Sequence, residues 1–382
     1  MNPADVSRRT FLGRSCAAAG SLAAAGATAP AGGFFTGGGD TLRIGLIGCG
    51  GRGTGAAAQA LAADPGVRVA ALADLFPDRI ESAAEILGRR AGPAGTCPTS
   101  RRFAGADAWL RLLDVDLDAV ILATSPDARP AQVAATVAAG RHVFCEAPAA
   151  IDAGGVATVL AACDAARARG LAFGSGLAWR HDPATTRKIE LIHAGGIGRP
   201  VSAVVFARIG PAWRTSGPAA TAADTRRNWI SCPARSGGDL VEHQVHAIDK
   251  ALWAWGDEPP AWVEPVGSRD AGTAVRYLFA DGRVLEAGIA RRPGGRDRIV
   301  EVVRGDQGGC DLREAGVGRH ARGMAAFVAA IRAGRPLDEG RHLCRSTLAA
   351  VLGGEAAAAA APVTWPAWAA AARPRRQAAE SA

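Results

Sequence analysis

A glycine-rich turn between an apolar run and a helix constrains this chain more than any other feature. The run Leu42–Ile47 has the composition of a buried parallel strand, and glycines follow at positions 48, 50 and 53. An alanine-rich segment over 54–63 predicts a helix, and a second apolar run over 67–73 ends at Asp74. Strand, tight turn, helix and strand in this order predict a parallel sheet with helices on its faces.

The glycine spacing also predicts a dinucleotide site. Gly48 permits the tight turn, Gly50 lets the backbone approach a pyrophosphate, and Gly53 lets helix and strand pack closely. Asp74 is placed to accept hydrogen bonds from adenosine ribose hydroxyls and to repel a 2′-phosphate. The pattern therefore favours NAD over NADP, although Arg52 or Arg79 leaves NADP possible.

Strands and helices continue to alternate after this unit. Apolar runs over 118–126 and 142–148 predict two more buried strands, and 130–140 predicts a helix between them. Ligands bind at the carboxyl ends of the strands in such a doubly wound sheet. The predicted cofactor-binding residues are Gly48, Gly50, Gly51, Arg52, Gly53, Asp74, Thr124, Ser125, Glu146 and Pro148.

The second half has a different pattern. After a predicted helix over 151–169, strands are expected over 201–208, 261–267, 273–279, 283–290 and 298–304, with late helices over 323–334 and 343–361. Asp281–Gly282 is a hairpin turn signal. We expect an α/β fold with a Rossmann domain over 40–150, an α+β domain with a largely antiparallel open sheet over 151–365, and a tail over 366–382.

The N-terminus resembles a twin-arginine export signal. Arg8 and Arg9 precede Phe11, Leu12 and a weakly apolar Ala/Gly segment. Residues 1–29 are therefore expected to be a signal peptide, and the protein is expected to be periplasmic or otherwise extracytoplasmic. The alternative is a disordered, arginine-bearing N-terminus.

Composition argues against several classes of protein. The net charge of +8 comes mostly from dispersed arginines, and no basic run is interleaved with aromatic residues, so we expect no nucleic-acid partner. No uninterrupted apolar stretch reaches the ~18 residues that a membrane span requires. The eight cysteines form no CxxC pair and no disulfide framework. The lysines are Lys188 and Lys250 alone.

These motifs resemble the Gfo/Idh/MocA family of oxidoreductases, most closely its exported members. Glu146-Ala147-Pro148 corresponds to the family's Glu-Lys-Pro motif, and "RNW" at 227–229 and "GGDLVEHQVHAID" at 237–249 are also similar. The resemblance covers about 42–365. It implies NAD(P)-dependent oxidation or reduction of sugars and cyclitols, with the open sheet used for dimer or tetramer contacts. Alanine replaces the expected lysine at 147, and Pro130 stands where a histidine is often found.

The resemblance also implies a catalytic set at Glu242 and His246. A histidine suits proton removal from a hydroxyl because its unperturbed pKa is near ~6.5. Glu242 and Asp249 lie four residues before and three after it, so both share its face if the segment is one helix. A core histidine beside a helix-terminal acid is the structural alternative. A metal held by Glu242, His243, His246 and Asp249 is disfavoured, because a carboxylate–histidine site explains the same spacing.

Substrate contacts are expected from Arg180, His181, Trp229 and Asp249, through charge-assisted hydrogen bonds and ring stacking. Three functions remain open. The first is an oxidoreductase acting on a sugar, cyclitol or glycoside. The second is a glycosidase or lyase that uses NAD transiently, since "EAPAA" resembles Rossmann glycoside hydrolases over that stretch. The third is a non-catalytic sugar- or cofactor-binding protein.

Overall fold

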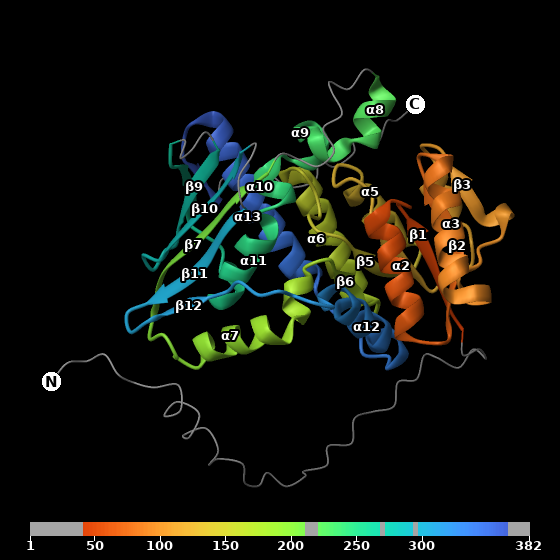
Figure 1. Cartoon of the computed structure of the whole chain (residues 1–382), viewed down its shortest axis with the longest axis horizontal. Coiled ribbons are helices and arrows are strands. Elements are labelled where there is room, and N and C mark those ends of the chain that lie inside the picture. Colours follow the sequence, from red (N-terminus) through yellow and green to blue (C-terminus); the bar gives the residue numbers. More distant parts are fainter. Residues whose placement is uncertain (1–40, 211–220, 268–271, 293–296, 366–382) are drawn as a thin grey trace, which may run out of the picture. The chain divides into compact units, whose positions relative to one another are not determined.

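The computed structural model describes residues 41–210, 221–267, 272–292 and 297–365. The expected export signal over 1–29 and the expected tail over 366–382 lie outside these residues. Two sheets organise the described part of the chain (Figure 1). No helix within it is long and apolar enough to cross a membrane.

The first sheet is parallel throughout and has the strand order β3-β2-β1-β4-β5-β6. Its strands are β1 (Leu42–Ile47), β2 (Val67–Asp74), β3 (Arg102–Ala104), β4 (Ala119–Leu122), β5 (His142–Cys145) and β6 (Phe173–Ser175). The order reverses between β1 and β4, and the crevice at such a switch point is where doubly wound sheets bind ligands. The sheet extends past the expected domain boundary at residue 150, because β6 is its last strand.

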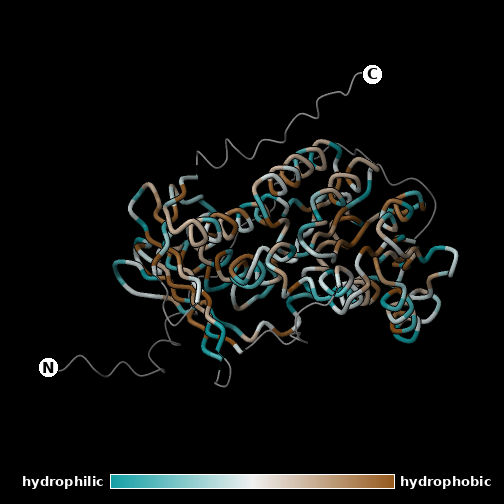
Figure 2. Tube along the Cα trace, turned by 90° about the horizontal axis from the view of Figure 1, so that it is seen from above, coloured by the Kyte–Doolittle hydropathy of each residue, from teal (hydrophilic) through white to brown (hydrophobic). Residues whose placement is uncertain are grey.

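Helices cover both faces of this sheet. They are α2 (Gly51–Ala63), α3 (Pro77–Ala91), α4 (Ala108–Leu113), α5 (Arg129–Ala138), α6 (Ala153–Ala168) and, from the far end of the chain, α12 (Arg319–Arg332). Side chains alternate between two apolar cores: on β4, Ile121 packs with α2, α3 and α12, and Val120 packs on the other face. Figure 2 shows the hydrophobic colour following the inner segments and the hydrophilic colour on the outer loops.

The second sheet is mixed, with the order β12-β11-β7-β10-β9-β8-β13. Its strands are β7 (Pro200–Ile209), β8 (Trp262–Pro265), β9 (Thr273–Leu278), β10 (Val284–Arg291), β11 (Arg298–Gly305), β12 (Gly309–Asp311) and β13 (Val363–Thr364). Every pairing is antiparallel except β7 with β10. The expected α/β fold, with a Rossmann sheet followed by a largely antiparallel one, is confirmed.

One face of the second sheet packs on two helices, α11 (Val245–Ala254) and α13 (Gly340–Ala359). The remaining helices are α7 (Pro183–His193), α8 (Ala222–Arg227), α9 (Pro233–Ser236) and α10 (Asp239–Glu242), with 3-10 turns η1 (Gly92–Gly95), η2 (Thr99–Arg101), η3 (Ala178–His181) and η4 (Trp229–Ser231). The short elements α8 to α10 bring residues of the second half to the carboxyl ends of the parallel strands (Figure 1).

Candidate functional site

The glycine loop has the geometry that its spacing predicts. Gly48 has φ of 96°, and a Cβ there would lie 2.6 Å from the backbone of Ala123. A Cβ on Gly53 would lie 1.9 Å from the carbonyl oxygen of Gly48, so helix α2 and strand β1 approach too closely for any side chain. In contrast, nothing lies within 4 Å of a Cβ on Gly50 or Gly51. Open space at the start of α2 is what a phosphate-binding backbone requires.

Asp74 closes the other side of this loop. Its carboxylate accepts the backbone N–H of Cys49 at 2.7 Å and that of Phe76 at 2.9 Å. The carboxylate is therefore held at the carboxyl end of β2 and faces the same crevice. Arg79 lines that crevice as well, and its guanidinium lies 5.0 Å from the centre of the Phe76 ring.

A cleft of about 750 Å³ follows the carboxyl ends of β1, β2, β4 and β5. This volume lies within the range of small-molecule and cofactor sites. Its lining includes these predicted site residues: Gly48, Gly50, Gly51, Arg52, Asp74, Thr124, Ser125, Glu146, Trp229 and Glu242. Gly53 and Pro148 lie just behind it, the first packing against Gly48 and the second accepting a hydrogen bond from Arg129.

Glu146 is fixed at the inner end of the cleft, beside Ala147. Arg52 donates from Nε to Oε1 of Glu146 at 2.7 Å and from Nη2 to Gln59 at 2.9 Å. A Cβ on Gly176 would lie 2.3 Å from the Glu146 carboxylate, so that glycine makes the room it occupies. Ala147 itself lines the cleft wall.

Arg129, from the first turn of α5, lies against the backbone on both sides of Ala147. Its Nη1 donates to the carbonyl oxygens of Glu146, at 3.1 Å, and of Pro148, and its Nη2 donates to that of Thr124 at 2.6 Å. The side chain is buried, its Nε has no hydrogen-bond partner among the described residues, and the residue lines the cleft.

Glu242 and His246 titrate far from their usual pH ranges. Burial raises the pKa of Glu242 to about 8; Arg129 opposes this rise and Glu146 adds to it. Burial lowers the pKa of His246 to about 4, with Glu146 opposing the change. Glu242 is therefore protonated and His246 neutral at pH 7. Oε2 of Glu242 and Nδ1 of His246 are buried without a hydrogen-bond partner among the described residues.

The expectation that one helical face carries Glu242, His246 and Asp249 is wrong. Helix α10 ends at Glu242 and α11 begins at Val245, so the acid and the histidine belong to different helices. Asp249 is 1% exposed and turned away from the cleft, where it accepts hydrogen bonds from Arg180 at 2.8 Å and from Ser346 at 2.7 Å.

Arg180 and His181 also lie outside the cleft lining. Arg180 is held by Asp249 and Asp257, its Nη2 lying 2.6 Å from Oδ1 of Asp257, while His181 pairs with Glu339 at 2.7 Å. Neither side chain is placed to contact a ligand in the cleft. Of the four expected substrate contacts, the structure brings Trp229 alone to the cleft.

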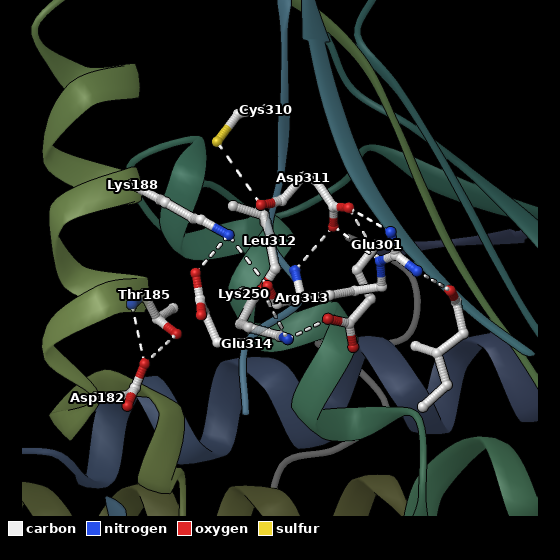
Figure 3. Close-up of polar contacts among 11 residues, drawn as sticks. Asp182, Thr185, Lys188, Lys250, Glu301, Cys310, Asp311, Leu312, Arg313 and Glu314 are labelled. Carbon is white, nitrogen blue, oxygen red and sulfur yellow. Dashed lines mark hydrogen bonds and ion pairs between the residues drawn. The ribbon is translucent and has the colours of Figure 1, made fainter. Parts of the chain in front are cut away.

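Both lysines of the chain are committed elsewhere (Figure 3). Lys188 pairs with Glu314 at 2.6 Å and donates to the carbonyl oxygen of Arg313. Lys250 is buried, pairs with Glu301 and lies 4.3 Å from the centre of the Trp179 ring. Neither lysine lines the cleft.

Sequence reasoning missed several cleft residues. Gln132 accepts the Thr124 hydroxyl at 2.6 Å, and Arg235 pairs with Asp127 at 2.7 Å. His320 at the start of α12 lies outside the cleft lining but interacts electrostatically with Arg52 and Glu146, which line it. Gln132 had a readable signal, since Arg129 and Gln132 are long polar side chains on the buried face of α5. His320 had none, because it is distant in sequence from everything it approaches.

The first comparison with known proteins concerns the parallel sheet, from β1 to β6. Residues 42–175 match the sequence model of the Gfo/Idh/MocA group, the oxidoreductase family with an NAD-binding Rossmann fold. These residues, about a third of the chain, form an NAD-binding Rossmann domain.

Relatives extend the similarity beyond the Rossmann domain. Inositol 2-dehydrogenase 3 of Saccharopolyspora erythraea is 30% identical over 219 residues, 57% of this chain and 55% of the relative. A glycosyl hydrolase family 109 protein of Bacteroides thetaiotaomicron is 37% identical over 114 residues, 29% of this chain and 23% of the relative. The chain thus matches little more than half the length of the first and less than a quarter of the second.

A solved structure shares the whole two-sheet fold. Scyllo-inositol dehydrogenase from Lactobacillus casei, solved with NAD(H) and scyllo-inositol, covers 85% of this chain and 99% of its own, with a TM-score of 0.65 and 19% identity. At this identity the likeness establishes the fold. The Rossmann domain and the mixed sheet therefore occur together in that protein too.

Proposed function

We propose that the chain is an NAD-dependent oxidoreductase that acts on a hydroxyl of a sugar, cyclitol or glycoside. The observation that carries this proposal is the junction of two features in one cleft: a phosphate-binding glycine loop with Asp74, and a buried carboxyl, Glu242, that titrates near neutrality. The Rossmann domain and the inositol dehydrogenase relative support the same class.

The residues present fit a dinucleotide. Gly50 and Gly51 leave open space before the N–H groups of α2, and the Asp74 carboxylate is positioned for ribose hydroxyls. Thr124 and Ser125 line the path from there to Glu146. NAD would supply the hydride acceptor at that inner end.

Proton handling is assigned to Glu242 and His246. Oxidation of an alcohol removes a proton from the hydroxyl, and a group that titrates near the working pH is best suited to accept it. Glu242 lines the cleft and has a pKa of about 8, so it accepts the proton at alkaline pH and donates one to a carbonyl near neutrality. His246 lies outside the cleft lining and, with a pKa of about 4, is a weaker proton acceptor than Glu242, so its assigned role is to relay the proton rather than to hold it.

The experiment uses the purified full chain. Bound nucleotide is released with acid and identified by absorbance and mass, and a panel of sugars, cyclitols and glycosides is then added to intact protein at pH 7 and pH 9. Reduction of NAD by a member of the panel, faster at pH 9, is expected. Absence of bound nucleotide, of NAD uptake and of any spectral change would support a non-catalytic binding protein instead.

A second function has a specific observation behind it. The glycosyl hydrolase family 109 relative is 37% identical over 114 residues. A glycosidase of this kind would oxidise a ring hydroxyl to a ketone with transfer of the hydride to NAD, lose a proton next to the ketone and eliminate the leaving group, add water across the resulting double bond, and return the hydride to the ketone. Release of an aglycone from a glycoside without net NADH would identify it, whereas stoichiometric NADH identifies the dehydrogenase.

We also propose export through the twin-arginine route, because Arg8 and Arg9 precede a weakly apolar segment. Cell fractionation of the natural chain and of an Arg8→Lys/Arg9→Lys variant tests this, and an unchanged distribution would refute it.

Assembly into a dimer or tetramer is proposed through the open face of the second sheet. Its apolar side chains Val204, Phe206 and Val300 line a hollow there, and they alternate with the buried Ala203, Val205 and Val303 of the other face. Light scattering during size-exclusion chromatography measures the molar mass in solution, and a monomeric mass at micromolar concentration would contradict the proposed assembly.

A further inference from the structure

The cleft contains one buried positive charge without a carboxylate partner. Among the other described arginines of its lining, Arg52, Arg227 and Arg235 pair with Glu146, Asp78 and Asp127, respectively. Arg79 is half-buried and donates to the carbonyl oxygen of Arg227, and Arg226 is exposed. Arg129 is 3% exposed and donates to three carbonyl oxygens, with no carboxylate within ion-pair distance among the described residues. A buried guanidinium held by neutral acceptors has no counter-ion, so its positive charge acts on the groups around it.

The place of that charge is specific. Nη1 of Arg129 binds the carbonyl oxygens of Glu146 and Pro148, which are the residues before and after Ala147. The resemblance to dehydrogenases predicts a lysine ammonium at position 147, and both lysines of the chain are paired elsewhere, with Glu301 and Glu314.

We infer that Arg129 takes the electrostatic place of the absent lysine. Its guanidinium is held by hydrogen bonds to the carbonyl oxygens on both sides of Ala147, and from there it supplies the fixed positive charge at the proton-handling end of the cleft. The inference rests on the proposed function. Arg129 acts through Glu242 and is therefore a positioning residue. A guanidinium does not give up a proton at neutral pH, so this chain separates the two roles that one lysine combines: Arg129 holds the charge and Glu242 carries the proton.

The other charges around Glu242 do not duplicate this one. Glu146 at the end of β5 pairs with Arg52 and, being negative, adds to the raised pKa of Glu242. On α10 and β10, Asp239 pairs with Arg291, which also contacts His243. These groups, together with the neutral His246 on α11, leave Arg129 as the charge that opposes burial in setting the pKa of Glu242.

The test follows the titration of Glu242 directly and needs no substrate. Infrared difference spectra between the full chain and Glu242→Gln give the carboxyl signal as a function of pH. In Arg129→Met, the pKa of Glu242 is expected to rise by about one unit, a tenfold change in proton affinity. In Arg129→Met/Ala147→Lys, where the charge is returned at the expected lysine position, it should fall back.

Arg141→Met is the matched control. Arg141 also donates to a carbonyl oxygen, that of Leu117, and also has an unpartnered Nε, yet it lies before β5, at the opposite ends of the same strands. Its replacement is expected to leave the Glu242 titration unchanged. An equal titration in Arg129→Met and in the natural chain, with NAD still bound, would overturn the inference.

Arg129→Met removes three hydrogen bonds to the backbone and can fail to fold. In that case Ala147→Lys alone decides, since a second cation beside Arg129 is expected to lower the pKa of Glu242, and no change would overturn the inference. Failure of the proposed function can be told apart from failure of this inference. In the first case no substrate is oxidised, while the pKa of Glu242 still changes with the charge at positions 129 and 147.

Discussion

Arg180 and Arg129 both carry a largely buried positive charge, but their surroundings differ. Arg180 lies between Asp249 and Asp257, and Ser346 completes the hydrogen bonding of Asp249. The hydrogen bonds of Arg129 within the described residues go to carbonyl oxygens, and the side chain lines the cleft. A buried charge that is paired with carboxylates serves the structure, because it joins the elements that carry the partners. A buried charge without such a partner beside a cleft acts instead on the groups and ligands in that cleft.

The largest expected effect is on stability, in Arg180→Met. Removing the guanidinium leaves Asp249 buried without a counter-charge, whereas Asp257 keeps His342 at 3.1 Å and Arg345 at 3.9 Å. Breaking a buried pair such as Arg180–Asp249 costs about 3–5 kcal/mol. Urea unfolding followed by circular dichroism measures the loss. NAD affinity of the folded fraction should stay unchanged, because Arg180 lies outside the cleft.

Arg276→Met is the control for that measurement. Arg276 also bridges two carboxylates, Glu264 and Glu286, but its side chain is 35% exposed. Its loss is expected to cost below about 1 kcal/mol. Equal destabilisation of the two variants would show that burial does not make the ion pairs of Arg180 more important for stability than those of Arg276.

The second effect concerns Glu242→Gln, which is expected to lower kcat by about 10² or more, since a positioned proton acceptor contributes at least that factor. The rise of the rate between pH 7 and pH 9, set by the pKa of about 8, should disappear with it. Steady-state NADH formation between pH 6 and pH 10 measures both.

The same variant makes a stability prediction with a defined sign. The pKa of Glu242 is raised from 4.5 to about 8 in the folded chain, so the folded state binds a proton that the unfolded state has lost between those pH values. Stability contributed by this group therefore falls as pH rises from about 4.5 to about 8. Glu242→Gln should be more stable than the natural chain at pH 9 and similar to it at pH 4; a constant difference would contradict the raised pKa.

The glycine loop could be predicted from sequence because its determinants are local. Gly48, Gly50, Gly53 and Asp74 lie in one strand–helix–strand unit, and spacing alone fixes their roles. The role of Asp249 could not be predicted in this way. Its partners Arg180 and Ser346 are 69 and 97 residues away, so only the folded chain shows that its charge is already used.

The proton-handling end was predicted in part. Glu242 and its place in the cleft followed from the family pattern, but the break between α10 and α11 did not, since no proline or glycine marks it between Glu242 and Val245. Arg129 had a local signal, a charged residue on the buried face of an amphipathic helix. Its meaning depended on knowing that neither lysine reaches the cleft.

A third effect separates two glycines within the loop. Gly50→Ala places a methyl group in open space where the pyrophosphate is expected, so folding should be unaffected and the Kd for NAD should rise about tenfold, or 1.4 kcal/mol. Gly53→Ala places one 1.9 Å from the Gly48 carbonyl oxygen and should lower Tm instead. Calorimetric titration and thermal unfolding distinguish them, and a Gly50→Ala variant with undiminished affinity would place the phosphates elsewhere.

The smallest effect is expected for Lys188→Met. The side chains of Lys188 and Glu314 are 28% and 26% exposed, and partly exposed pairs of this kind contribute below about 1 kcal/mol. Lys250→Met should destabilise the chain more, because it leaves Glu301 largely buried without its partner. Neither variant should alter NAD reduction per folded molecule, measured with the best substrate of the panel. If either one abolishes turnover while the chain stays folded, a lysine does serve the site, and the assignment of the fixed charge to Arg129 loses its basis.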